Sequence, residues 1–183
     1  MRGAIFLAVL AAIVIAVYSG NGGAPVYPVT QERARQILSK TDLPPVFGSN
    51  PVSAQVVTNK PSEVTWIVSN NGPELMRYTA TLSAAGEGKT RVALELKGSK
   101  GGPAGDVEKR FAENPSVKNL YVVAMQERIA SSLEGRGFDM ARIYPALGSA
   151  MVGNMGNIQR SADEAAKASE ELERGQSVKR KGG

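Results

Sequence analysis

Few side chains in this chain could do chemistry, because its 183 residues include neither histidine nor cysteine. This absence removes thiol nucleophiles, imidazole bases, disulfides and the usual zinc ligands. Among the remaining candidates, Glu63, Glu74 and Glu95 fall at strand ends or on outward faces, where a solvated role is favoured over acid–base work. Tyr78 points inward, where a tyrosine needs a hydrogen-bond partner. We therefore expect no catalytic residue, no metal and no cofactor, and a protein that is not an enzyme.

Phosphate and nucleic-acid binding find little support in the sequence. The Gly-rich segment 98–105 (GSKGGPAG) lacks the Gly-Lys-Ser/Thr ending of a P-loop. The net charge is +5, but three of the positive charges belong to the terminal triplet Lys179, Arg180 and Lys181. A basic excess of this size is a weak nucleic-acid signal, so no nucleic-acid partner is expected.

The N-terminal segment, residues 1–20, is expected to be a membrane anchor or a signal segment. Residues 4–18 (AIFLAVLAAIVIAVY) form an unbroken apolar run behind Arg2, and the next positive charge is Arg33. Its length lies between a signal-peptide core and a spanning helix, which needs roughly 20 apolar residues. The charge pattern predicts a single-pass protein of the inner (cytoplasmic) membrane, with its N-terminus cytoplasmic and its main domain extracytoplasmic, or periplasmic. Cleavage after Ser19 remains open.

After a Gly/Pro linker at 21–28, the residues 29–138 are expected to form one α+β domain. Thr30 is placed to cap a short helix. Four segments, 52–59, 63–69, 74–83 and 90–97, have the composition or the alternation of strands, and tight turns between them predict an antiparallel meander. Polar residues occupy one face of the later strands, so one side of the sheet faces water and the other needs a cover.

The segment 116–134 predicts the helix that covers the sheet. Ser116 is placed to cap it, Gly135 ends it, and Glu127 falls on its polar side. The apolar side of this helix is expected to be core. An alternative is that the space between the helix and the sheet holds a ligand, with these candidate wall residues: Trp66, Met76, Tyr78, Leu94 and Met125.

This arrangement resembles the helix-grip fold of the START-like and polyketide-cyclase-like (SRPBCC) superfamily. The resemblance rests on the strands 64–68 and 76–82, the Gly86-x-Gly88 turn into Thr90-Arg91-Val92, and the closing helix 119–133. It implies a curved antiparallel sheet that grips the last helix, often around an apolar cavity, and in many members it implies binding of lipids or other apolar ligands. The chain departs from the family in its membrane-directed start and its helical extension.

A helical extension at 139–175 and a disordered basic tail at 176–183 are expected to follow. No charge occurs between Arg142 and Arg160. A helix here must bury its apolar residues against the domain itself, or against a partner or a membrane surface. The candidate partner contacts are Leu147, Met151, Val152, Met155 and Ile158.

Together these features favour a non-enzymatic, membrane-anchored accessory or scaffold subunit of a membrane protein assembly. The expected partners are the membrane, through residues 4–18, and one or more proteins. The alternative is a START-like binding module for an apolar or lipid ligand.

Overall fold

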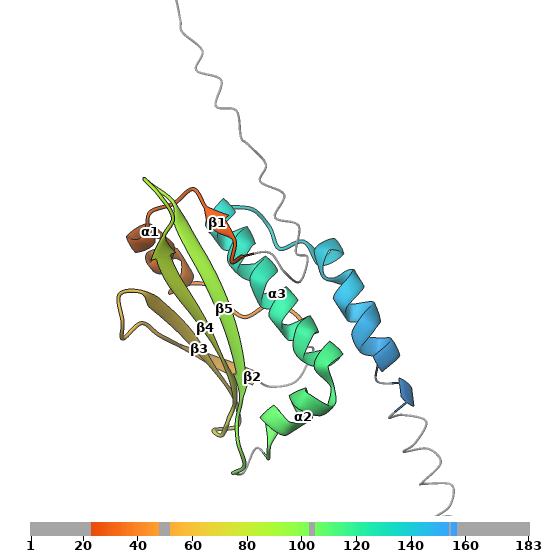
Figure 1. Cartoon of the computed structure of the whole chain (residues 1–183). Coiled ribbons are helices and arrows are strands. Elements are labelled where there is room, and N and C mark those ends of the chain that lie inside the picture. The colour runs from red at the N-terminus through yellow and green to blue at the C-terminus, as the bar shows by residue number, and fades with distance from the viewer. Residues whose placement is uncertain (1–22, 48–51, 103–104, 154, 157–183) are drawn as a thin grey trace, which may run out of the picture.

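The computed structural model describes residues 23–47, 52–102, 105–153 and 155–156, and within them the chain is an α+β protein (Figure 1). Five antiparallel strands form one sheet in the order β1-β5-β4-β3-β2. The sheet confirms the expected antiparallel meander over β2 to β5. The strand bounds are β1 Val26–Tyr27, β2 Val52–Val57, β3 Glu63–Asn70, β4 Glu74–Ala84 and β5 Thr90–Gly98.

The helices begin and end where local chemistry favours it. The Thr30 side chain accepts a hydrogen bond from the backbone N–H of Arg33, and Asp106 does the same for Lys109. Gly135, at φ 67°, ends the long helix in the left-handed conformation. The helix bounds are α1 Gln31–Leu38, α2 Val107–Glu113, α3 Pro115–Glu134 and the 3₁₀ helix η1 Met140–Arg142. Residues 144–153 are also helical.

The two faces of the sheet differ as the sequence predicted. On β4, Met76, Tyr78, Ala80 and Leu82 are buried, while the alternate positions are exposed or half-buried. The buried side chains form one core with Ala34 and Leu38 of α1 and with Met125, Ile129, Ala130 and Leu133 of α3. The opposite face of the sheet is wet, so α1 and α3 supply the cover that the apolar face requires.

Two expectations about the domain need correction. The linker expected at residues 21–28 contains β1, which adds a fifth strand to the sheet, with Val26 opposite Arg91. The N-cap of α3 is Asn114 rather than Ser116, because Pro115 takes the first helical position, where its fixed φ suits the helix. The N-terminal membrane segment and residues 157–183, which include Ile158, lie outside the described residues.

The helix over residues 144–153 packs on the outer side of α3, antiparallel to it (Figure 1). Its buried residues are Ala146 and Ala150, in register with Ile143 just before it. At one end of this helix, Gly153 lies against Ser116 at the start of α3. At the other end, Arg142 lies just before the helix and reaches Glu127 of α3 at 3.5 Å. One side of this extension therefore packs against the domain itself, which was one of the two expected outcomes.

Gly98, at the end of β5, allows α2 to approach the sheet. A Cβ atom built there would lie 2.5 Å from the backbone nitrogen of Glu108 and 2.8 Å from the carbonyl carbon of Val107. Neither neighbour is a flexible side chain, so the backbone itself would have to move.

We expect Gly98→Ala to lower the free energy of unfolding by about 1–3 kcal/mol, the usual cost of overpacking. Urea denaturation monitored by circular dichroism measures it. Gly137→Ala is the control, because nothing lies within 4 Å of the Cβ position there. Equal stability of the two variants would show that the contact between β5 and α2 is not tight.

Candidate functional site

The five candidate ligand-wall residues lie in the packed core. Trp66, Tyr78 and Met125 are 0% exposed and Met76 is 4% exposed, while Leu94 is half-buried and packs against the same core. Neither of the two hollows described below is lined by any of the five. The structure thus brings the five together as side chains that fill the space between sheet and helix.

The polar atoms of Trp66 and Tyr78 are both used within the fold. Trp66 Nε1 donates to the carbonyl oxygen of Thr41 at 2.8 Å, and the Tyr78 hydroxyl donates to the carbonyl oxygen of Tyr121 at 3.4 Å. Burial raises the pKa of Tyr78 far above its ordinary value. The hydroxyl therefore stays protonated and joins β4 to α3, so it has the hydrogen-bond partner that an inward tyrosine needs.

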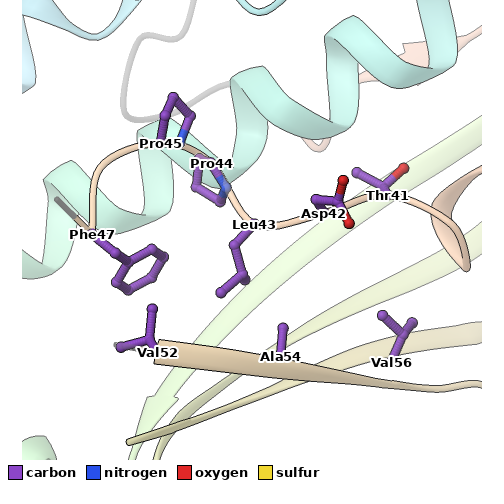
Figure 2. A pocket seen from close by; sticks show the side chains of 9 residues that line it. All are labelled: Thr41, Asp42, Leu43, Pro44, Pro45, Phe47, Val52, Ala54 and Val56. Atoms are coloured by element: carbon purple, nitrogen blue, oxygen red, sulfur yellow. The ribbon is translucent and has the colours of Figure 1, made fainter. Parts of the chain in front are cut away.

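A hollow of about 450 Å³ lies beside the core, between the segment 41–47 and the inner face of β2 (Figure 2). Figure 2 shows Leu43 and Phe47 pointing toward β2 from one side. The opposite wall consists of alternate β2 residues, and among the described lining residues Asp42 alone is charged. These described lining residues are Thr41, Asp42, Leu43, Pro44, Pro45, Phe47, Val52, Ala54 and Val56.

The segment 41–47 is held by contacts to both layers of the core. Besides the bond from Trp66, the Arg128 Nε of α3 donates to the carbonyl oxygen of Asp42 at 3.1 Å. The Phe47 ring stacks on the ring of Tyr121 with 5.3 Å between centroids. Pro44 is fully buried. The wall of the hollow is therefore fixed before any ligand arrives.

The sequence patterns did not predict this hollow. Phe47 was expected to plug the core; it stacks on Tyr121 but also lines the hollow. The available signal was the sequence of β2, VSAQVV, which has neither the charge nor the proline that usually protects an edge strand.

A second hollow, of about 420 Å³, lies near α2, where β4 begins and β5 ends, and charged groups line it. Its carboxylates are already paired. Glu74 accepts two hydrogen bonds from Arg77, and Glu108 accepts from the Gly98 N–H at 2.6 Å and from Lys118 at 2.9 Å. These donors lower the pKa of both carboxyl groups, so they remain ionised and are poor proton donors.

Glu127, expected on the polar side of α3, is instead 3% exposed beneath the chain that follows the helix. Arg136 binds both of its carboxylate oxygens, and Arg142 reaches it at 3.5 Å. The backbone N–H of Asp139 also donates to it at 3.0 Å. The Glu127 side chain therefore fastens segment 136–142, and with it the start of the helix over 144–153, to the middle of α3.

An exposed apolar stripe runs along the outer side of the helix over 144–153 and continues beyond it to Met155. It consists of Tyr144, Met151, Val152 and Met155, each between 58% and 70% exposed. Three of these residues are predicted partner contacts, whereas Leu147, also predicted, is half-buried on the inner side. At 3.6 residues per turn, Tyr144, Met151 and Met155 align along the helix and Val152 lies about 80° to one side, so the four share a broad face.

Other kinds of site are missing from the described part of the chain. No group of three or more His, Cys, Asp or Glu residues is arranged to hold a metal ion within the described ranges. No helix in those ranges is long and apolar enough to cross a membrane, and residues 4–18 are outside them.

We expect Glu127→Gln to lower the free energy of unfolding by about 2 kcal/mol. This loss is smaller than is usual for breaking a buried ion pair, because Arg136 and Arg142 are both partly exposed to solvent. Chemical denaturation measures the loss, and hydrogen exchange should show faster exchange over residues 144–153. The control is Glu134→Gln, because Glu134 pairs with the same Arg136 but is 37% exposed, so it should cost under about 1 kcal/mol. Unchanged exchange over 144–153 would contradict the fastening role of Glu127.

Comparison of the chain with protein-family models, with curated proteins and with solved structures found no match. The resemblance to the START-like superfamily therefore stays a prediction. The function has to be inferred from the surfaces that the fold leaves open, which are the hollow beside β2 and the apolar stripe.

Proposed function

We propose that this chain is a non-enzymatic accessory or scaffold subunit, anchored in the membrane through residues 4–18, that attaches to a partner protein through its C-terminal helix. The observation that carries the proposal is the stripe of Tyr144, Met151, Val152 and Met155. Four large apolar side chains side by side on one exposed face are unusual for a monomer and typical of an interaction site.

The surroundings of the stripe support attachment to a protein. The helix is fixed on its inner side, where Ala146 and Ala150 pack against the domain and Arg142 reaches Glu127. A rigid apolar face needs little ordering when it binds, so a larger share of the contact free energy becomes affinity. The sequence 143–159 carries no charge that a partner would have to desolvate.

The proposed location follows from the N-terminal sequence. The apolar run 4–18 follows Arg2, and a signal-anchor of this kind places the main domain on the extracytoplasmic, or periplasmic, side of the inner membrane. In this arrangement the core is a divergent START-like helix-grip domain that acts as a platform. A sheet covered by a long helix supports that assignment.

The alternative function, binding of an apolar or lipid ligand among Trp66, Met76, Tyr78, Leu94 and Met125, has weaker support. These residues pack together in the core. The polar side-chain atoms of Trp66 and Tyr78 already donate hydrogen bonds to backbone carbonyl oxygens. Attachment through the stripe needs no rearrangement of that core.

We expect the native protein, extracted in mild detergent from its own membranes, to elute as a complex larger than the monomer. Val152→Lys combined with Met155→Lys should release the monomer, because a buried interface does not tolerate unpaired charge. The matched control is Thr81→Lys combined with Ala93→Lys, which adds the same charge on the wet face of the sheet. A wild-type monomer, or equal release by both pairs, would overturn the proposal.

Membrane attachment is tested separately from partner binding. The full chain should stay with the membrane pellet after alkaline carbonate extraction. The variant that lacks residues 4–18 should be found in the supernatant. Recovery of the full-length chain in the supernatant would overturn the anchor and would leave the stripe experiment interpretable.

A further inference from the structure

The outer edge of β2 is open for hydrogen bonding. β2 pairs with β3 on one side, and no strand of the described chain pairs with its other side. Its six residues include no charge and no proline, the usual protections of an edge against a further strand. The backbone N–H and C=O groups on that side are therefore available to an extended chain.

A hollow whose lining side chains are mostly apolar runs along the same strand. Val52, Ala54 and Val56 are alternate residues on the inner face of β2, opposite Asn70, Val68 and Trp66 of β3. Leu43 and Phe47 face them across the hollow (Figure 2). A strand added beside β2 would lie about 4.8 Å away and would point every second side chain to this same face. The open edge and the hollow therefore both fit an extended chain with apolar side chains at alternate positions.

We propose that β2 accepts an extended segment of a partner protein as a sixth strand, with large apolar side chains at alternate positions in the hollow and a cationic residue beside Asp42. The cationic residue follows from charge complementarity. The Asp42 side chain is 91% exposed at the Val56 end of the hollow, and its contact with Arg128 is long, at 3.7 Å. Recognition by strand addition draws affinity from backbone bonds and specificity from the pockets for alternate side chains.

The described chain begins at the opposite edge of the sheet and ends on the outer side of α3. The N-terminal segment enters at β1, the opposite edge of the sheet, which four strand spacings put roughly 19 Å from β2. The C-terminal segment leaves from the outer side of α3, where Gly153 lies against Ser116. A second copy fits poorly, because its β2 would offer only two valines and an alanine to a hollow of about 450 Å³.

This inference goes beyond the proposed attachment through the stripe, because it concerns another surface and another kind of ligand. The helix that carries the stripe lies on the outer side of α3, away from the sheet, whereas β2 is an edge of the sheet (Figure 1). Failure at one surface therefore leaves the other testable.

The probe is a fluorescent nine-residue peptide of alternating leucine and threonine with a lysine at each end. Its binding to the full chain in nanodiscs is measured by fluorescence anisotropy. We expect saturable binding and slower hydrogen exchange at the β2 amides, residues 52–57. A peptide N-methylated at alternate amides keeps the side chains but loses backbone donors, and should bind at least about tenfold more weakly. A peptide of the same composition with all its leucines in one block should bind as weakly as the N-methylated peptide.

The decisive variants are lysine substitutions at two adjacent positions of β2. Ala54→Lys places a charge in the hollow and should weaken binding by about tenfold or more. Gln55→Lys adds the same charge on the opposite face of the strand and should change binding by less than about threefold. Both positions are exposed, so both variants should fold, which circular dichroism checks. Asp42→Asn should weaken the lysine-ended peptide but not a version that ends in glutamine.

Several results would overturn the inference. Equal binding of the plain and N-methylated peptides would assign the hollow to an apolar ligand rather than to a strand. Equal effects of Ala54→Lys and Gln55→Lys would remove the hollow from recognition. No saturable peptide binding, or a concentration-dependent dimer that Ala54→Lys abolishes, would reject the partner segment, and the dimer would replace it with a second copy.

Discussion

Burial of the apolar face of β3, β4 and β5 beneath α3 is the interaction on which the rest of this structure depends. The sheet has one wet side, so its other side must be covered for the chain to fold. Trp66, Tyr78 and Met125 are fully buried in that space, and the polar side-chain atoms of Trp66 and Tyr78 donate hydrogen bonds to backbone carbonyl oxygens. Because side chains pack the centre, we looked for open surfaces at the periphery of the domain.

α3 is unusual in being covered on two sides. Its inner side meets the sheet, and its outer side meets the segment that Glu127 fastens through Arg136 and Arg142. A buried carboxylate is tolerable only because charged and backbone donors surround it. The ion pairs determine where the C-terminal helix lies, and thereby which of its faces is left exposed.

The two open surfaces are of different physical kinds. The stripe offers apolar side chains on a rigid helix and suits a partner that is already folded. β2 offers backbone groups beside an apolar hollow and suits an extended chain. Both lie outside the core, so either can bind without disturbing the packing that keeps the sheet covered.

Local sequence patterns were sufficient for β2 to β5 and for the long helix, because alternation and helical spacing report which residues share a face. They were insufficient for β1, whose two residues form a strand only by pairing with β5. The burial of Glu127 depends on arginines 9 and 15 residues away, brought back by a turn of the chain. The hollow likewise exists only where segment 41–47 crosses β2. Alternation and helical spacing along the chain show which faces are apolar. Which of those faces are covered and which stay open follows from the folded arrangement, because it depends on contacts between distant segments.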